Sequence, residues 1–194
     1  MALSRIYWAA AHWRRGALRR WHTADKSVGA AVVLLALVLA GFGLGLQMLF
    51  AQDDERRAAA REAERRSLEC LARNVYFESR GEPVAGMYAV AEVTMNRKAS
   101  GRYPATVCGV VYQKNWDPLR KRYVGAFSWT EFDDLPAPAG EPWQQAWEVA
   151  EAVYYGREPP VLEGATHFHA VYIKPDWARR KKPIARIGGH VFYK

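Results

Sequence analysis

The sequence predicts a mainly helical α+β domain with a small β element, preceded by one N-terminal transmembrane helix. Three observations carry this prediction: an uncharged apolar run at residues 28–50, three later segments with apolar residues at helical spacing, and short strand-like runs near the C-terminus. The 194 residues leave room for one compact domain and some non-globular sequence.

The apolar run at residues 28–50 is long enough to span a membrane. It lies in an uncharged stretch from Ser27 to Gln52. At about 1.5 Å per helical residue, it exceeds a hydrocarbon core of about 30 Å. It is longer than an ordinary signal-peptide core, and no clear cleavage site of small residues follows it. We therefore expect an uncleaved signal anchor. The alternative, a buried helix of a soluble protein, is disfavoured because the run is apolar on every face.

The net charge of +8 is unevenly distributed along the chain. Residues 1–52 carry +5 and the remainder +3, so most of the excess lies beside the apolar run. Basic residues before a span favour a cytoplasmic N-terminus, and arginines after the run make this bias modest. We predict a cytoplasmic basic segment at residues 1–27, a single pass through the inner (cytoplasmic) membrane and a periplasmic domain. The same distribution argues against a nucleic-acid partner.

Residues 51–66 are strong helix formers with Glu/Arg pairs at helical spacing and no apolar stripe. This pattern predicts a charged, solvated helical stalk. The globular domain is then expected at residues 67–194. Within it, apolar residues at helical spacing predict helices at residues 67–80, 84–98 and 142–156.

The rest of the domain gives weaker signals. Between residues 100 and 141 the proline and glycine content predicts loops, apart from a short apolar run at Val107–Tyr112. Tyr172-Ile173 and His190–Tyr193 are the strand candidates. The expected result is a helical core with a small, irregular β element.

Cys70 and Cys108 are the only cysteines in the sequence. Their spacing matches no metal motif, and two thiols in an exported domain favour one structural disulfide. Two unpaired buried thiols fit the sequence nearly as well, so both states stay open at this point.

Glu78 has the surroundings of an acid that keeps its proton. On a helix at 100° per residue it falls beside Leu71, at the margin of the apolar stripe. It also lies in the last helical turn, where the dipole disfavours a negative charge, and partial burial raises a carboxyl pKa further. Arg80 projects to nearly the opposite side. This arrangement suits a general acid; the alternative is an edge glutamate paired with a lysine.

The segments around Glu78 and further along the chain follow a family pattern. They resemble the cell-wall hydrolase and spore-cortex-lytic enzyme family (SleB type), in unbroken order over nearly all of residues 68–194. The matching segments are Tyr76-x-Glu78-Ser79-Arg80-Gly81-Glu82-Pro83, Ala89-Val90-Ala91-x-Val93-x-x-Asn96-Arg97, Tyr103-Pro104-x-Thr106-Val107-Cys108-Gly109, Phe127-Ser128-Trp129, Thr166-His167-Phe168-His169 and Ile187-Gly188-x-His190-x-Phe192-Tyr193.

The resemblance implies a lysozyme-like or lytic-transglycosylase-like fold, with Glu78 as the essential acid and no cofactor. It implies cleavage of peptidoglycan glycan strands between N-acetylmuramic acid and N-acetylglucosamine, leaving a 1,6-anhydro end. One glutamate acting first as acid and then as base suffices for that product, whereas an ordinary hydrolase needs a second carboxylate. The candidates for the second carboxylate are Glu82, Glu92, Glu131 and Asp133. Glu82 precedes a proline, and we expect it to hold the turn or shape the groove.

Several polar and aromatic residues are candidates for contact with the sugar chain. Ser128 could bond the acid or an N-acetyl group, and aromatic rings can stack on the apolar faces of sugars. Two residues depart from the family pattern: Ala126 replaces a glutamine, and Phe168 replaces a frequent tyrosine. The predicted substrate-binding residues are Tyr76, Glu82, Tyr112, Ser128, Trp129, His167, His169 and Tyr172.

Two other kinds of protein fit parts of the sequence. His167, His169 and His190 invite a zinc-dependent wall amidase, but they lack the His-Glu-x-x-His spacing of a metalloprotease helix, so we predict no metal site. The other alternative is a non-catalytic peptidoglycan-binding or scaffold module. The predicted partners are peptidoglycan strands and, through residues 28–50, the lipid bilayer; the sequence identifies no protein activator.

Overall fold

The computed structural model describes residues 26–194. The predicted cytoplasmic segment, residues 1–27, therefore lies outside the described residues except for its last two positions. Two compact units divide the chain: the first ends at Ala58 and the second comprises Ala59–Lys194.

A single continuous helix, α2 (Lys26–Glu78), contains the apolar run and the charged segment after it. Its apolar residues 28–50 are almost all exposed, and among the described helices it alone is long and apolar enough to cross a membrane. Ion pairs at helical spacing follow the run: Glu62 accepts from Arg65 and Arg66, at 2.9 and 2.8 Å. Exposed pairs of this kind add only a few tenths of a kcal/mol each, about 0.3–0.5.

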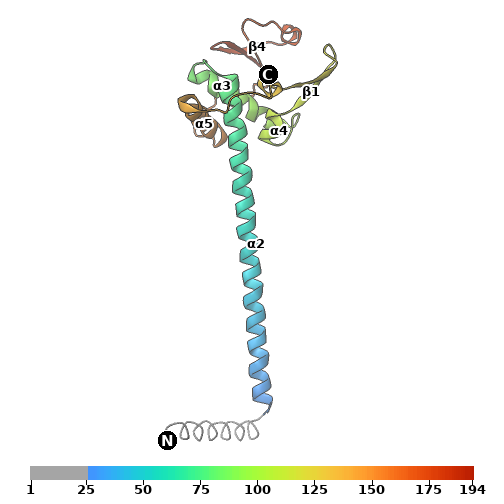
Figure 1. Ribbon diagram of the computed structural model, residues 1–194, viewed down its shortest axis with the longest axis vertical. Coiled ribbons are helices and arrows are strands. Elements are labelled where there is room, and N and C mark those ends of the chain that lie inside the picture. Colours follow the sequence, from blue (N-terminus) through green and yellow to red (C-terminus); the bar gives the residue numbers. More distant parts are fainter. Residues whose placement is uncertain (1–25) are drawn as a thin grey trace. The chain divides into compact units, whose positions relative to one another are not determined.

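The second unit contains the helices predicted from the apolar spacing. Figure 1 shows α3 (Val84–Ala99), α4 (Val107–Val111) and α5 (Gly140–Tyr154) gathered around the C-terminal end of α2. The helix predicted at residues 67–80 is the last part of α2, which ends at Glu78. Gly81 follows in the left-handed region (φ 82°), which glycine adopts without strain and which turns the chain toward α3.

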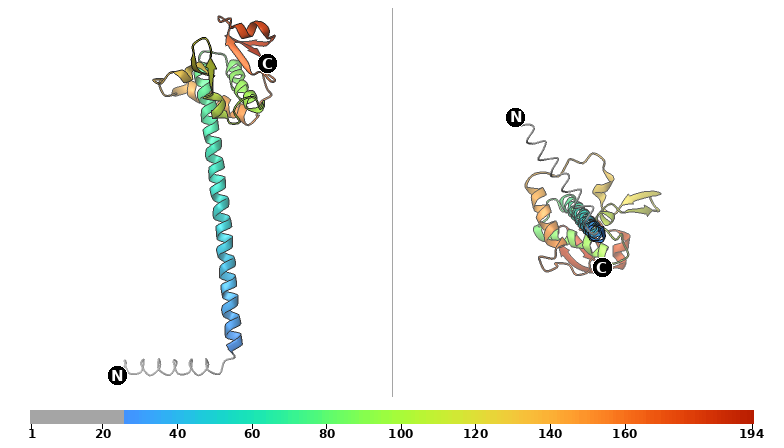
Figure 2. Two further views of the ribbon diagram at one scale, coloured as in Figure 1. Left: turned by 90° about the vertical axis from the view of Figure 1, so that its right-hand side faces the viewer. Right: turned by 90° about the horizontal axis from the view of Figure 1, so that it is seen from below.

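The β structure is more extensive than the sequence indicated. A hairpin, β1 (Lys114–Asp117) with β2 (Arg122–Gly125), projects from the helical part (Figures 1 and 2) within a segment predicted as loop. A three-stranded antiparallel sheet has the order β3-β5-β4, with bounds His167–Ala170, His190–Tyr193 and Pro183–Ile187. The prediction for His190–Tyr193 is confirmed. The prediction for Tyr172-Ile173 is wrong, because these residues lie in the turn after β3.

Helix α3 connects the helical layer to the sheet because it is buried on two sides. One side joins the larger core, where Met87 and Ala91 pack with Leu71 and Val75 of α2 and with α4 and α5. The other side joins a smaller core, where Ala89 and Val93 pack with Phe192 of β5. Figure 2 shows the other helices and the three-stranded sheet on either side of α3. The mainly helical α+β fold predicted from the sequence is confirmed.

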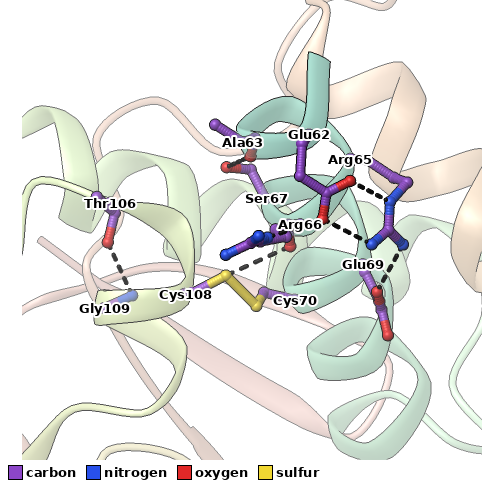
Figure 3. Close-up of a disulfide and its surroundings, with 10 residues drawn as sticks. All are labelled: Glu62, Ala63, Arg65, Arg66, Ser67, Glu69, Cys70, Thr106, Cys108 and Gly109. Atoms are coloured by element: carbon purple, nitrogen blue, oxygen red, sulfur yellow. Dashed lines mark hydrogen bonds and ion pairs between the residues drawn. A yellow bond between two sulfur atoms is a disulfide. The ribbon is translucent and has the colours of Figure 1, made fainter. Parts of the chain in front are cut away.

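In the structure Cys70 and Cys108 form a disulfide that joins α2 to α4 (Figure 3). Their Cα atoms are 5.2 Å apart, within the usual range for a bridge. Helix α4 is itself started by Thr106, whose side chain accepts a hydrogen bond of 3.0 Å from Gly109 N. The bridge thus fixes the short α4 against the helix that ends in Glu78.

Candidate active site

Glu78 is the last residue of α2, and its carboxyl faces the short 3-10 helix η1 (Ser128–Glu131). The Oε1 atom is buried and has no hydrogen-bond partner in the described chain. Burial raises the pKa of Glu78; the nearby backbone of Ser128 and Trp129, the Arg97 charge and the Ser128 hydroxyl offset part of this effect. The acid form of Glu78 is therefore favoured to a higher pH than that of a free glutamate.

A buried hydrogen-bond chain holds η1 against α2 beside this carboxyl. Trp129 Nε1 donates to Asn74 Oδ1 at 2.9 Å, and Asn74 Nδ2 donates to Thr94 Oγ1 at 3.1 Å. The Trp129 ring also stacks on Phe77, with 4.7 Å between the ring centroids. These contacts fix both chain segments that flank the Glu78 carboxyl.

Arg97 of α3 is the cation that acts on Glu78. It is buried, its Nε donates to Thr166 O at 2.8 Å, and its guanidinium lies 4.9 Å from the centroid of the Phe127 ring. Burial lowers the pKa of Arg97, while Tyr103 and Glu78 raise it. Arg97 belongs to one of the family-like segments, but no role was predicted for it, because its partners Phe127 and Thr166 are remote in sequence.

Three of the predicted substrate-binding residues lie together near Glu78. Ser128 is exposed at the start of η1. Trp129 is buried and forms part of the site wall. Tyr112 meets the Trp129 ring edge to face at 5.6 Å and is 44% exposed, so its ring remains accessible. Ser128 and Tyr112 are thus accessible to a sugar chain, while the buried Trp129 packs against Tyr112 and follows Ser128 in η1.

Glu82 is engaged elsewhere. Its Oε2 accepts from Gly189 N at 2.8 Å, and its Oε1 lies 3.4 Å from His190 Nδ1, an ion-pair distance without hydrogen-bond geometry. Both partners lie at the turn between β4 and β5. In this structure Glu82 therefore holds the β4–β5 turn.

Two of the other three candidate carboxylates, Glu92 and Glu131, are also held by hydrogen bonds. Glu92 accepts from the backbone N–H groups of Val161 and Leu162 at 2.7 and 2.6 Å. Glu131 accepts from Arg122 and from Gly125 N, both at 2.8 Å, and the Arg122 bond lowers the pKa of Glu131. Asp133 is exposed. In the described chain, no second carboxylate is among the groups that shift the pKa of Glu78.

The two histidines of β3 lie in a separate aromatic cluster with Trp177 and Tyr193. His167 Nδ1 shares a hydrogen bond of 2.8 Å with Thr166 Oγ1, and His169 Nε2 shares one of 2.9 Å with the Tyr193 hydroxyl. Burial, with nearby cations such as Lys181, lowers the pKa of His167 to about 4. His167 is therefore neutral near pH 7.

Two further predicted residues lie apart from this cluster. Tyr172 is 84% exposed in the turn after β3, and within residues 26–194 no hydrogen bond or ring contact joins it to the other candidates. Tyr76 packs edge to face with Trp143 of α5 and lines a pocket that Glu78 does not line. Over the same residues, no group of three or more His, Cys, Asp or Glu side chains is placed to hold a metal ion.

The geometry as a whole supplies one carboxylic acid in a rigid wall, beside an accessible hydroxyl and an accessible aromatic ring. Such a site can donate a proton to a substrate oxygen and later recover one. Within residues 26–194, no other carboxylate is among the groups that shift the pKa of Glu78, so no partner is identified there as a nucleophile.

Comparison with known proteins gives relatives of one kind. The spore cortex-lytic enzyme of Oceanobacillus iheyensis is 29% identical over 128 residues, which are 66% of this chain and 41% of the relative. Those of Halalkalibacterium halodurans and Bacillus cereus are 33% and 31% identical, over 64% and 66% of this chain and 34% and 44% of theirs. The chain thus spans less than half the length of these curated relatives.

Two solved structures share the fold. The catalytic domain of the Bacillus cereus SleB protein superposes with a TM-score of 0.52 at 28% identity, over 66% of this chain and 89% of that one. The catalytic domain of the germination-specific lytic transglycosylase SleB from Bacillus anthracis gives the same TM-score and identity, over 66% and 93%.

The sequence profile of the Cell Wall Hydrolase family matches residues 81–193, more than half of the chain. Glu78 lies just before this segment, so its role rests on the site geometry. The chain belongs to the cell wall hydrolase family.

Proposed function

We propose that this protein is a membrane-anchored lytic transglycosylase that cleaves peptidoglycan between N-acetylmuramic acid and N-acetylglucosamine. The observation that carries the proposal is the buried Oε1 of Glu78, which has no hydrogen-bond partner within residues 26–194. The raised pKa of this carboxyl suits a general acid. Family membership and the lytic transglycosylase named among the solved relatives support the same reaction.

In the proposed reaction Glu78 donates its proton to the glycosidic oxygen, and the bond from that oxygen to C1 of the muramyl residue breaks. The leaving N-acetylglucosamine unit takes the proton as its new hydroxyl. The muramyl 6-hydroxyl then attacks the oxocarbenium-like C1 and passes its proton to the Glu78 carboxylate. This closes a 1,6-anhydro ring and restores the acid, with no water consumed.

The local engagement of the other carboxylates supports this choice over an ordinary hydrolase. Glu82, Glu92 and Glu131 each accept hydrogen bonds from backbone N–H groups. These bonds fix the three side chains on other segments of the chain, and none of the three is among the groups that shift the pKa of Glu78. The intramolecular 6-hydroxyl needs no such second group.

The membrane anchor is the second part of the proposal. Residues 28–50 would span the inner membrane, residues 51–66 would form the stalk, and residues 67–194 would act in the periplasm. The exposed apolar surface and length of α2 support a span. The basic segment at residues 1–27 supports a cytoplasmic N-terminus. A reporter fused after Lys194 should be active only on the periplasmic side; activity only in the cytoplasm would overturn this orientation.

The central experiment is mass spectrometry of muropeptides released from purified peptidoglycan by the full-length protein in detergent. Wild type should release 1,6-anhydro muropeptides, and the Glu78→Gln variant should release none. Products with reducing ends would reject the transglycosylase reaction in favour of hydrolysis. Free stem peptides with intact strands, suppressed by a chelator, would indicate an amidase. Wall binding by both proteins without any product would indicate a binding module.

A further inference from the structure

A pocket of about 260 Å³ opens where α2 ends and the chain turns into α3. Its walls include Tyr76, Arg80 and Glu82 from this connection, Met87 from α3, and Pro142 and Gln145 from α5. Glu78 does not line it. Helical spacing places Tyr76 about 160° from Glu78 around the axis of α2. The pocket and the proposed acid therefore lie on different sides of the same helix end.

The size of the pocket limits what it can hold. Pockets that enclose drug-sized ligands measure roughly 300–1,000 Å³. A volume of about 260 Å³ falls below this range and suits a group of amino-acid size better than a pair of sugar rings.

The charged groups of the pocket favour an anion. Arg80 is exposed, and no carboxylate in the described part of the chain pairs with it; its guanidinium lies 6.0 Å from the centroid of the Tyr76 ring. Glu82, the acidic residue of the wall, is already engaged by Gly189 N and His190. The wall thus contains one cation without a carboxylate partner in the described chain, beside a carboxylate that already accepts a hydrogen bond from Gly189 N.

Uncharged donors complete the wall. Within residues 26–194 the Tyr76 hydroxyl and the Gln145 amide have no hydrogen-bond partner. A guanidinium with adjacent amide and hydroxyl donors is the arrangement that binds a carboxylate, and arginine can do so through two parallel hydrogen bonds.

We infer that this pocket binds the carboxylate end of a peptidoglycan stem peptide, so that the enzyme prefers peptide-bearing strands to bare glycan. This inference rests on the proposed function. The stem peptide branches from the muramic acid whose C1 would react at Glu78. An α-helix with its side chains is about 10–12 Å across, and three to four extended residues span about the same distance at roughly 3.3 Å each. A stem peptide can therefore reach from the acid side of α2 to the pocket.

The test compares two substrates with the full-length protein in detergent: intact peptidoglycan, and the same strands after enzymatic removal of the stem peptides. Wild type should show a higher kcat/KM on intact strands, mainly through a lower KM. In Arg80→Gln the ratio of kcat/KM between the two substrates should fall about tenfold, since a lost charged contact is worth about one factor of ten. Arg186→Gln removes another exposed arginine with no partner in the described chain and should keep the wild-type ratio.

A binding measurement separates this inference from the proposed reaction. A soluble stem tetrapeptide, titrated against the protein by NMR, should perturb residues around Arg80 in wild type and in Glu78→Gln, and bind at least tenfold more weakly to Arg80→Gln. Three results would overturn the inference. Arg80→Gln could lose the same factor in kcat/KM on both substrates, or wild type could cleave both substrates equally well. The third is peptide binding that Arg80→Gln leaves unchanged. If wild type cleaves neither substrate but still binds the peptide in a way that depends on Arg80, the proposed reaction would be rejected and the peptide-binding role of the pocket would stand.

Discussion

The Trp129 indole donates its N–H to Asn74 Oδ1 across 2.9 Å, one helical turn before Glu78. Both residues are buried, and the Asn74 side chain in turn donates a hydrogen bond to Thr94 of α3. A single side chain thus connects η1, α2 and α3 next to the proposed acid. The precision of the site depends on a polar network inside the hydrophobic core.

Replacing Asn74 by leucine should therefore destabilise the domain. The change keeps the side-chain size but leaves the buried Trp129 N–H and Thr94 hydroxyl without this partner, at a cost of about 1–3 kcal/mol for an unsatisfied buried group. Urea unfolding followed by near-UV circular dichroism in detergent measures this loss. In the double variant Asn74→Leu with Trp129→Phe the two losses should be smaller than additive, because the donor has also gone. Strict additivity would show that the bond contributes nothing.

The raised pKa of Glu78 predicts how activity depends on pH. A general acid works in its protonated form, so kcat/KM should fall as the pH rises through the pKa of Glu78, and this limb should lie above the ordinary glutamate value of about 4.3. Rates measured on purified peptidoglycan between pH 4 and 9 give the profile. An Arg97→Gln variant removes a charge that lowers the pKa of Glu78 and should move the limb to higher pH. An unmoved limb would assign the titration to another group.

The same pKa has a consequence for folding that is independent of catalysis. A carboxyl whose pKa is raised in the folded state binds more protons folded than unfolded, so it favours the fold at low pH. That stability is lost as the pH rises from the unfolded pKa through the folded one. Glu78→Gln cannot ionise and should be relatively more stable than wild type above this window. Melting temperatures of both proteins between pH 4 and 8 should diverge as the pH rises; parallel curves would contradict the raised pKa.

The sequence indicated the parts of this fold that depend on local pattern. Apolar residues at helical spacing predicted α3 and α5. Helix α5 buries one periodic face, whereas α3 is buried on two sides, and Glu78 was placed at the edge of an apolar face. The hairpin β1–β2 was missed because its strands are mostly exposed and show no alternation of buried and exposed residues. The strand prediction for Tyr172-Ile173 failed for the opposite reason. The pair is apolar, but it is exposed and pairs with no strand.

In the site, too, only the features that depend on local pattern could be predicted from the sequence. The position of Glu78 follows from its own helix, but the bond between Asn74 and Trp129 joins residues 55 positions apart. The contact of Arg97 with Thr166 joins residues 69 apart, and nothing local distinguishes Arg97 from an arginine whose head reaches solvent. The contact of Glu82 with the β4–β5 turn is more distant still, at 107 positions. Such pairings depend on how the elements pack.

The disulfide between Cys70 and Cys108 predicts sensitivity to reductant. It closes a loop of 38 residues, and loop-closure entropy gives a stabilisation of about 4 kcal/mol for that length, toward the upper end of what such bridges deliver. Adding dithiothreitol should lower the melting temperature of wild type clearly. The variant with both Cys70→Ala and Cys108→Ala should melt lower and ignore the reductant. A wild type that ignores dithiothreitol would show that the two thiols are not bridged in solution.

Gly188 at the β4–β5 turn should be far less tolerant of substitution than Gly156 after α5. Both have positive φ, 54° and 62°, so alanine strains the backbone at either position by about 1 kcal/mol. A Cβ at Gly156 would meet open space, whereas one at Gly188 would collide with the Glu82 carboxylate and approach Pro83. Gly188→Ala should therefore cost clearly more than Gly156→Ala in urea unfolding, which makes Gly156 the matched control for strain alone. Glu82→Ala should recover part of the excess in the Gly188→Ala background, because it removes the atoms in collision. Equal costs at the two glycines would mean that the turn does not rest on Glu82. In that case the Glu82 side chain would shift away from the added Cβ at little cost.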